Sequence, residues 1–292
     1  MKLGVIANPE KYSIKEPLNR LLNWCSENDH QITVSKEFKQ SVSGVEFNSE
    51  LHVAESEKEC ISESDFIIAI GGDGTMLHTA KYVRYSDSPI LGVNTGKLGF
   101  MANVQPDQIE SALHDLQSGN FDIDKRAMLQ GVSREGDIYY ALNEFLFTKK
   151  DTSSMVSLKA SYDGYLLNHF WADGLLISTP TGSTAYNLSA GGPIVMPGTP
   201  VMIVTPINPH TLTTRPLVLP SDKNLVIEVE DQPDHILFSS DGRMSDQTLS
   251  DMTISKSDLS VNLVMLKNQN YFKTLRNKLM WGLDSRKAPG DS

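Results

Sequence analysis

The stretch DFIIAIGGDGTMLHTA, residues 65–80, joins two sequence patterns through a glycine-rich turn. Residues 65–70 form an apolar, β-branched run that predicts a buried strand. From Thr75 onward, apolar residues recur at helical spacing, at Met76, Ala80 and Val83. Three glycines and one acid separate strand from helix: Gly71, Gly72, Asp73 and Gly74. The stretch therefore predicts a strand–turn–helix unit whose turn lets backbone approach a ligand closely.

This turn has the features of an anion-binding loop, which makes its acid unusual. In open α/β sheets, ligands bind beyond the carboxyl ends of the strands, and the amides that start the next helix favour negative charge. The carboxylate of Asp73 would repel an anion there, so we expect it to accept a proton or hold a metal. The alternative is that Asp73 only caps a tight turn. The spacing departs from the GxGxxG fingerprint of dinucleotide-binding folds.

Strand and helix patterns alternate through the first part of the chain. Strand-like runs at 2–7, 31–35 and 89–93 alternate with helical patterns, including one at 109–116 that Gly119 stops. This alternation predicts an α/β domain over residues 1–122, with a parallel, doubly wound, Rossmann-like sheet.

The pattern changes after about residue 122. Short strand-like runs follow one another, separated by turn residues such as YDGY, PSDKN and SSDGR. Residues 123–265 contain no good amphipathic helix pattern and predict an all-β domain. The tail, residues 266–292, contains the helical pattern YFKTLRNKLMWG, and we expect it to pack back on the body of the protein.

Composition limits the class of protein. The chain has 292 residues, of which 39% are hydrophobic and 21% charged, as expected of a globular protein. A formal net charge of −10 disfavours nonspecific binding to nucleic acid or to an anionic membrane. No signal peptide or membrane-spanning pattern is predicted. Cys25 and Cys60 are too few for a disulfide framework, and buried free thiols indicate a cytoplasmic protein.

A second glycine-rich stretch, GVNTGKLG at residues 92–99, resembles a phosphate-binding P-loop. It is one residue short between the glycines, and Leu98 stands where Ser or Thr should bind Mg²⁺. A glycine-rich turn after a strand is therefore the better interpretation.

Two further stretches carry more polar side chains than a turn needs. LNEF puts Asn143 and Glu144 side by side in an apolar strand. Neighbouring strand residues face opposite sides, so we expect at least one of them to be buried and partnered, unless this is an edge strand. Residues 171–195 crowd hydroxyl and acidic residues around two short apolar runs, which suits a polar ligand. A solvated loop explains equally well the polar residues of PHTLTTRP, His210 and Arg215.

Five motifs, in their order and spacing, resemble those of bacterial NAD kinases: GGDGTML, GVNTGKLGF, NE, ADGLLISTPTGSTAYNLSAGGPI and PHTLTTRPLV. These enzymes phosphorylate the 2′-hydroxyl of the adenosine ribose of NAD to make NADP. GGDG is shared with diacylglycerol, sphingosine and 6-phosphofructo kinases, whereas TPTGSTAY is far more specific to NAD kinases. The resemblance implies transfer of the γ-phosphoryl group of ATP, with Mg²⁺ or another divalent metal accompanying the ATP.

Two other functions stay open at this point. The chain could be another GGDG-type kinase that acts on a lipid or sugar phosphate, although it lacks a basic amphipathic helix that would seek a membrane. It could instead be a non-catalytic sensor that binds a dinucleotide, although the presence of Asp73 speaks against this.

The resemblance also implies a fold and a set of site residues. The fold is an α/β N-terminal domain and a β-sandwich-like C-terminal domain, with NAD in the cleft between them. Asp73 corresponds to the catalytic acid–base residue. The residues implied in NAD binding are Gly74, Asn143, Glu144, Asp173, Thr184, Ala185, Tyr186, Asn187, Leu188 and Ser189. Further candidates are Gly72, Thr181, Ser183, His210 and Arg243, and no dedicated metal ligands are predicted.

The chain departs from many relatives at two positions. Trp171 stands where several relatives carry Arg, and Arg243 stands where they often carry Gln. Both positions bear on the nicotinamide end of the site and on the preference for NAD or NADH. NAD kinases often share residues between subunits, so we expect a homodimer or homotetramer with Tyr186 near an interface. Some members use polyphosphate as well as ATP.

Overall fold

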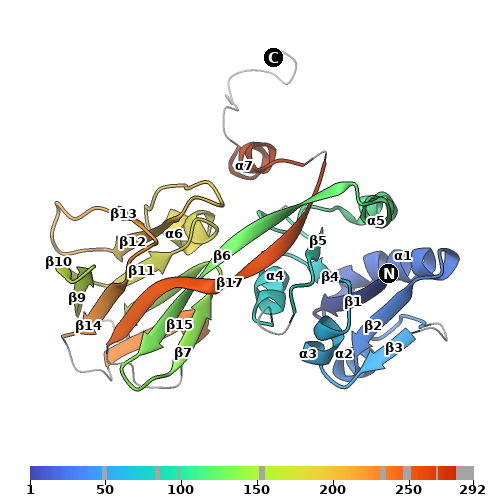
Figure 1. The fold of residues 1–292 in the computed structure, drawn as a ribbon, viewed down its shortest axis with the longest axis horizontal. Helices are drawn as coiled ribbons and strands as arrows, with labels where there is room; N and C mark the ends of the chain where they lie inside the picture. The colour runs from blue at the N-terminus through green and yellow to red at the C-terminus, as the bar shows by residue number, and fades with distance from the viewer. Residues whose placement is uncertain are drawn as a thin grey trace, which may run out of the picture. The chain divides into compact units, whose positions relative to one another are not determined.

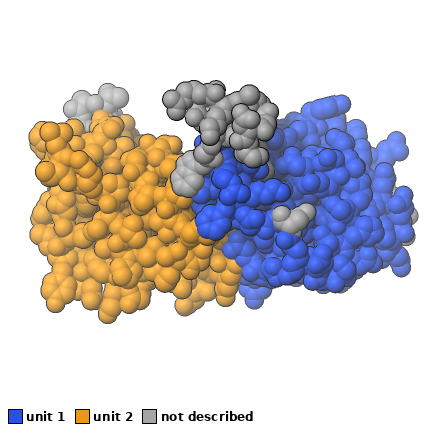
Figure 2. Space-filling model, turned by 90° about the horizontal axis from the view of Figure 1, so that it is seen from above, with its two compact units in different colours: residues 1–124, 262–292 blue, residues 125–261 orange. Residues whose placement is uncertain are grey.

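A computed structural model describes residues 1–47, 51–82, 86–97, 99–150, 155–230, 235–245, 251–267 and 269–280. The chain divides into two compact units, residues 1–124 with 262–292, and residues 125–261 (Figures 1 and 2). Two strands, β6 (Phe121–Ser133) and β17 (Met252–Leu266), carry the chain from one unit into the other. None of the helices in the described ranges has the length and apolar character that a membrane span requires.

The first unit is built on a parallel sheet in the order β3-β2-β1-β4-β5 (Figure 1). The C-terminal part of β17 adds to β5, where Leu263 pairs in parallel with Ile90. The strands of this sheet are β1 (Lys2–Ala7), β2 (Gln31–Ser35), β3 (Leu51–Ala54), β4 (Phe66–Gly71) and β5 (Ile90–Asn94).

Helices cover both faces of this sheet. On one face, Leu3 and Val5 share a core with α1 and α5. On the other face Gly4 lies against α3, because a Cβ atom at Gly4 would be 3.1 Å from the Cys60 carbonyl oxygen. The doubly wound α/β prediction is therefore confirmed. The helices are α1 (Lys15–Glu27), α2 (Lys36–Ser41), α3 (Glu57–Ser62), α4 (Asp73–Ala80), α5 (Ile109–Ser118) and α7 (Tyr271–Leu279).

Several local predictions in the first unit can be compared with these bounds. Helix α4 begins at Asp73, two residues earlier than expected, because the Gly72 carbonyl oxygen already accepts the N–H groups of Thr75 and Met76. Gly119 ends α5 in the left-handed conformation with φ of 71°. The helix predicted in the tail is α7, and Val83 and residues 281–282, which also belonged to predicted helices, lie outside the described residues.

Both cysteines are buried free thiols, as predicted. Burial raises the pKa of Cys25 and of Cys60 to about 12, so neither is a reactive thiolate at neutral pH.

The second unit is a sandwich of two antiparallel sheets, which confirms the all-β prediction. One sheet has the order β13-β12-β11-β8-β15-β16, and the other contains β10, β9, β14 and the first part of β17. Alternate residues of β8, Phe145 and Phe147, point into the core, where they meet Phe238 of β15 and Leu158 of β9. This alternation is typical of a sheet with one buried face.

The strands of this unit begin with β6 and end with β17. Between these two lie β7 (Ile138–Ala141), β8 (Glu144–Lys149), β9 (Val156–Tyr162), β10 (Tyr165–Ala172), β11 (Gly174–Ser178), β12 (Val201–Ile207), β13 (Leu217–Pro220), β14 (Leu225–Val229), β15 (Ile236–Ser240) and β16 (Arg243–Met244). Strand β8 pairs with β11 on one side and β15 on the other, so the edge-strand alternative for LNEF is wrong. A short helix, α6 (Tyr186–Ser189), was not predicted.

Candidate active site

The glycine turn of the first unit links β4 to α4 with little side-chain cover. Gly71 ends β4, and a Cβ atom there would lie 2.0 Å from the Thr75 hydroxyl oxygen, so only glycine fits. Gly72 and Gly74 have open space where a Cβ atom would point, and Gly74 is exposed. The first turn of α4 therefore presents bare backbone, which allows a phosphate group to approach closely.

The carboxylate of Asp73 is held by a neighbouring backbone segment. Its Oδ2 accepts the N–H of Phe100 at 2.8 Å, and its Oδ1 accepts those of Met101 and Ala102 at 3.0 and 3.3 Å. Gly99 packs against the same group, because a Cβ atom there would lie 2.1 Å from Oδ1. Asp73 is thus fixed in one orientation, and Oδ2, with one of these bonds, keeps a lone pair for another donor.

The second glycine-rich loop follows β5 and closes on itself. The side-chain oxygen of Asn94 accepts the N–H of Gly96 at 2.9 Å. The backbone N–H after Asn94 donates to the Gly71 carbonyl oxygen at 3.1 Å, so this loop lies against the glycine turn. Leu98, which argued against a P-loop, lies outside the described residues.

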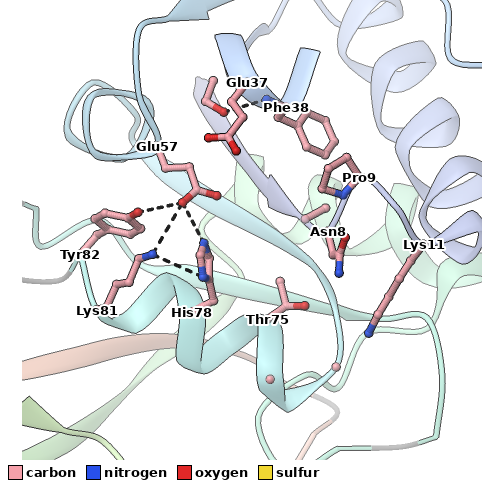
Figure 3. Close-up of a pocket in the computed structure, with 14 residues that line it drawn as sticks. Asn8, Pro9, Lys11, Glu37, Phe38, Glu57, Thr75, His78, Lys81 and Tyr82 are labelled. Atoms are coloured by element: carbon pink, nitrogen blue, oxygen red, sulfur yellow. Dashed lines mark hydrogen bonds and ion pairs between the residues drawn. The ribbon is translucent and has the colours of Figure 1, made fainter. Parts of the chain in front are cut away.

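A cavity of about 590 Å³ opens beside the glycine turn (Figure 3). Its walls come from the end of β1 and the loop that follows, from α2, from the start of α3 and from α4. The lining residues are Ala7, Asn8, Pro9, Lys11, Ser35, Glu37, Phe38, Glu57, Gly72, Gly74, Thr75, His78, Lys81 and Tyr82.

Glu57 organises one wall of this cavity (Figure 3). Its Oε2 accepts the Tyr82 hydroxyl at 2.8 Å and lies 2.7 Å from His78 Nε2 and 4.0 Å from Lys81 Nζ. Burial alone would raise the pKa of Glu57, but hydrogen bonds from His78 and Tyr82 and the charges of His78 and Lys81 outweigh it. The pKa of Glu57 therefore lies below its ordinary value, and its carboxylate is charged at neutral pH.

In the second unit, Asn143 and Glu144 lie where β8 begins, and both are buried. Asp241, in the turn between β15 and β16, accepts the N–H groups of Leu142, Asn143 and Glu144 at 2.8, 2.7 and 3.1 Å. The Asp241 N–H donates in turn to the Glu144 carbonyl oxygen at 3.0 Å. One carboxylate thus fixes the backbone of the polar pair.

The side chains of Asn143 and Glu144 have polar atoms that are not hydrogen-bonded to the described residues. Glu144 Oε2 is buried and has no hydrogen-bond partner among the described residues. No hydrogen bond joins the side-chain amide of Asn143 to the described part of the chain. Burial and then the charge of Asp241 raise the pKa of Glu144 to about 7. Since buried polar atoms are nearly always partnered in native proteins, a ligand that donates hydrogen bonds would complete this site.

The raised pKa of Glu144 predicts a dependence of stability on pH. The folded protein holds this proton between the ordinary pKa of 4.5 and about 7, whereas the unfolded chain loses it, so stability falls as pH rises through that window. At about 1.4 kcal/mol per pKa unit, we expect the free energy of unfolding to fall by about 2–3 kcal/mol more in the wild type than in Glu144→Gln. Urea unfolding at pH 4.5 and 8 measures this difference, and parallel pH profiles for the two proteins would contradict it.

The TPTG segment is fastened directly to the polar pair. The N–H of Thr179 donates to the Asn143 carbonyl oxygen at 2.8 Å, and its hydroxyl donates to the Leu142 carbonyl oxygen at 2.6 Å. Gly182 packs so closely on Asn143 that a Cβ atom would lie 2.2 Å from the Asn143 carbonyl oxygen. The sequence motifs NE and TPTG, which are far apart in the chain, therefore form one structure.

Two predicted site residues, Ser183 and Asn187, form their hydrogen bonds with other parts of the protein. The Ser183 hydroxyl is fully buried, donates to Pro180 and accepts the N–H of Val195 at 3.0 Å. The Asn187 amide, also fully buried, donates to the Ser183 carbonyl oxygen and accepts the Thr205 hydroxyl at 2.6 Å. The polar atoms of Ser183 and Asn187 are thus occupied by contacts that shape the loop.

The other predicted site residues of this loop range from buried to exposed. Thr181 is buried beside Arg126, whose Nη1 donates to its hydroxyl oxygen at 3.4 Å. Tyr186 is 44% exposed. The half-buried residues are Thr184, Ala185 and Leu188, and Ser189 is exposed.

Asp173 belongs to a different group of residues. It forms an ion pair of 2.5 Å with Lys149 and accepts the Asn208 amide at 3.1 Å, and these contacts hold its pKa below the ordinary value. The rings of Trp171 and His210, residues close to Asp173 and Asn208 in the chain, contact each other at a tilt of 36°, with centroids 4.4 Å apart. Asp173 precedes β11, whereas Ser178 at its other end pairs with Glu144, so the two groups lie at opposite ends of this strand.

The structure also adds residues that the sequence did not single out. Asp241 holds the backbone of Asn143, and Lys149 pairs with Asp173. Glu57 holds a wall of the cavity through its contact with His78. Only Asp241 had a local signal, the turn SSDGR, and that signal predicted a turn and no contact with Asn143. Burial raises the pKa of Asp241, and the charge of Arg243, an exposed residue two positions later in that turn, opposes this rise.

Comparison with known proteins agrees with this arrangement. Residues 3–121 match the ATP-NAD kinase N-terminal domain, and residues 142–266 match the ATP-NAD kinase C-terminal domain. An NAD kinase of Flavobacterium psychrophilum is 36% identical over 98% of this chain and 100% of its own length. The chain belongs to the NAD kinase family. An NAD kinase of Cytophaga hutchinsonii is 43% identical over 78% of this chain and 80% of its own.

Solved structures of NAD kinases and related enzymes have the same fold. Yeast NADH kinase, crystallised with NADH, superposes with a TM-score of 0.89 and covers 99% of this chain and 89% of its own at 22% identity. An NAD kinase from Archaeoglobus fulgidus, in complex with ATP, gives a TM-score of 0.73 over 96% of this chain and 99% of its own at 23% identity. Sequence comparison thus shows that the chain belongs to the NAD kinase family, and comparison with solved structures shows that it has the same fold.

Proposed function

We propose that this chain, a phosphotransferase of the NAD kinase family, transfers the γ-phosphoryl group of ATP to the 2′-hydroxyl of the adenosine ribose of NAD, which gives NADP. The observation that carries the proposal is the buried pair Asn143 and Glu144, whose side chains have polar atoms with no partner among the described residues. The ribose hydroxyls and the amide groups of a dinucleotide can donate the hydrogen bonds that the buried Glu144 side chain lacks.

In this proposal Asp73 is the general base. It would accept the proton of the 2′-hydroxyl as that oxygen attacks the γ-phosphorus and the bond to the leaving ADP breaks. Its three backbone hydrogen bonds fix the direction in which Oδ2 can accept a proton. The bare backbone of Gly72 and Gly74 would lie against phosphate groups.

A divalent metal enters with the donor. No group of three or more His, Cys, Asp or Glu side chains that could hold a metal occurs among the described residues. Proteins usually bind Mg²⁺ through one or two carboxylates together with substrate phosphates. Mg²⁺ neutralises charge on the donor phosphates, and the residues of this chain position the two substrates.

The test is direct. Purified protein is incubated with NAD, ATP and Mg²⁺, and NADP is measured, with diacylglycerol and fructose 6-phosphate as alternative acceptors. NADP as the main product supports the proposal. Phosphorylation of the lipid or sugar alone would indicate another GGDG-type kinase, and binding of NAD with no product would indicate a sensor.

Asn143 gives a sharper prediction about NAD binding. If its amide pairs with the bound dinucleotide, Asn143→Ala leaves a polar group of the ligand unpaired, which costs roughly 1–3 kcal/mol. We expect the KM for NAD to rise about tenfold or more, measured by initial rates at saturating ATP. Asn168→Ala, on β10, is the matched control. An unchanged KM with normal turnover would show that Asn143 is structural.

We also propose that the protein is a homo-oligomer with Tyr186 near an interface, and that it acts in the cytoplasm, where free thiols stay reduced. Large side chains exposed on the second unit support an interface, including Trp171 at 54% and Leu212 at 87%. We expect sedimentation to give a dimer or tetramer that Tyr186→Glu weakens. A monomer that is fully active at nanomolar concentration would contradict this.

A further inference from the structure

Another cavity lies within the first unit, where the chain after Ala102 meets the start of α7. It measures about 460 Å³, inside the range of about 300–1,000 Å³ that is usual for small-molecule sites. Its lining comes from residues 103–108 and 269–277, and Gln269 Nε2 joins these two parts of the chain by donating to the Asn103 carbonyl oxygen at 3.3 Å. It shares no described lining residue with the cavity beside the glycine turn.

The lining of this cavity is polar throughout. Its eight described residues are six with carboxamide side chains, one threonine and one lysine. No aromatic or aliphatic residue is among them, so the described lining gives a nucleobase or an apolar group no matching surface. A carboxamide both donates and accepts hydrogen bonds, as does each hydroxyl group of a sugar. Such a lining favours a ligand with several hydroxyl groups.

Several of these carboxamides use only their oxygen within the protein. Gln105 and Gln108 cap each other across η3 (Pro106–Gln108), where each side-chain oxygen accepts the backbone N–H of the other. The side-chain oxygen of Asn270 accepts the N–H of Lys273 at 2.8 Å. The NH₂ groups of all three carboxamides have no hydrogen-bond partner among the described residues and are left as donors.

Asn103 contributes an unpaired acceptor to the same lining. Its Oδ1 is buried and has no partner among the residues that the structure describes. Buried polar atoms are nearly always partnered in native proteins, so a donor from a bound molecule would complete this one. A hydroxyl group supplies such a donor, whereas an ionised phosphate oxygen does not.

Lys273 is the only charged residue in the described lining. It is exposed, and its ammonium group makes no ion pair within the described part of the chain. The neighbouring charges, Asp107 of η3 and Arg276 and Lys278 of α7, are exposed and lie outside the lining. A cation that shares the lining with three NH₂ donors and no carboxylate favours a phosphate group, whose oxygens accept hydrogen bonds.

This cavity adjoins the segment that holds Asp73. Asn103 directly follows Ala102, whose N–H donates to Asp73 at 3.3 Å. On the α7 side, the ring of Tyr271 contacts that of Phe100, with centroids 6.4 Å apart, and the Phe100 N–H donates to the same carboxylate. A molecule held by Asn103 and α7 therefore acts on the backbone that orients the proposed general base.

We propose that this cavity is an effector site for a phosphorylated sugar or polyol, with the phosphate at Lys273 and a hydroxyl group on Asn103 Oδ1. Binding at this site is independent of the proposed kinase function, whereas its effect on turnover rests on that function.

Calorimetry without NAD or ATP tests the site by itself. The probes are glucose 6-phosphate, ribose 5-phosphate and glycerol 3-phosphate, each compared with its unphosphorylated form and with inorganic phosphate. We expect at least one probe to bind with a Kd below about 1 mM, at least about tenfold more tightly than either of its comparison compounds. Lys273→Met should weaken this binding at least about fivefold, and Arg276→Met, a matched control on the same helix, less than about twofold.

A second variant guards against loss of structure. Lys273 and Asn277 are both exposed, so Lys273→Met and Asn277→Asp should keep the wild-type melting temperature. Asn277→Asp places a negative charge in the lining and should also weaken the probe at least about fivefold. No binding by any of the three probes overturns the site, as does binding that neither variant weakens.

Initial rates of NADP formation at saturating NAD and ATP test the effect on the general base. The bound probe should change kcat at least about twofold in the wild type, and less than that in Lys273→Met at the same probe concentration. Binding with an unchanged wild-type kcat overturns the effector role. Binding to a protein that makes no NADP supports the site and contradicts the proposed function alone.

Discussion

Asp73→Asn is expected to slow NADP formation at saturating NAD and ATP by at least about 100-fold, because Asn has the same shape but cannot take the proton. A positioned base typically contributes about 10²–10⁴ in rate. Removal of a carboxylate also relieves repulsion with bound phosphates, so NAD affinity should hold or improve. The paired measurements are NAD binding by calorimetry and NADP formation at saturation.

The contacts of Asp73 require a second variant for its interpretation. Asn offers one acceptor oxygen to three N–H donors, so the variant should also lose roughly 1–3 kcal/mol of stability. Gly99→Ala disturbs the same contact but keeps the carboxylate, since its Cβ atom would lie 2.1 Å from Oδ1. Gly96→Ala, where the nearest atom is 4.0 Å away, is the control.

Comparison of Asp73→Asn with Gly99→Ala distinguishes two roles for Asp73: accepting the proton, and holding the segment from Phe100 to Ala102 in position. If Asp73 is the base, Asp73→Asn should be at least about tenfold slower than Gly99→Ala. Equal losses would make Asp73 a positioning residue for the segment from Phe100 to Ala102. Near-normal turnover of Asp73→Asn would remove it from the chemistry, and loss of NAD binding would make it a binding residue.

Gly182→Ala is expected to weaken NAD binding at least about tenfold and to lower the melting temperature. The new Cβ atom would lie 2.2 Å from the Asn143 carbonyl oxygen and 2.7 Å from its Cα. Both are backbone atoms, and Asn143 is itself held by Asp241 and Thr179, so the conflict must move the polar pair. Overpacking of this kind typically costs about 1–3 kcal/mol.

A double mutant shows whether the two residues act through one structure. Added to Asn143→Ala, Gly182→Ala should weaken NAD binding by much less than it does alone, because both changes disturb the same contact. Calorimetry on the wild type, the two single variants and the double variant measures this, with Gly96→Ala as control. Additive losses would contradict the coupling, and wild-type affinity of Gly182→Ala would show that the loop can relax.

Local patterns were enough to predict much of the fold. The β-branched run before Gly71 and the helical spacing after it are set by residues close in sequence, and α4 and β4 formed there. The sandwich was predictable because its strands alternate, as Phe145 and Phe147 do. Helix α6 is only four residues long, too short to produce a periodic pattern.

The candidate site was less predictable, because its parts meet through contacts between distant residues. The pair Asn143–Glu144 was expected to contain a buried polar group, and both members are buried. That Asp241 fixes their backbone from almost 100 positions later could not be foreseen, since a DG turn looks the same in any hairpin. The sequence around Glu57 likewise shows only an acidic residue at the start of a helix. Its contacts with His78 and Tyr82 appear only in the folded structure.

The division of the first unit into two chain segments has a consequence during synthesis. Strand β5 gains its second neighbour, β17 at Leu263, only after all of residues 125–261 have been made. At about 5–20 residues per second, a ribosome would need roughly 7–27 s for that insertion. Until then the backbone of Val104, bonded to Gly92 and Asn94, covers only the later part of this edge of β5, and the strand's first residues stay available for pairing with another nascent chain. A fragment that stops at residue 124 would keep that edge permanently, so the first unit should be produced with residues 262–280 reattached.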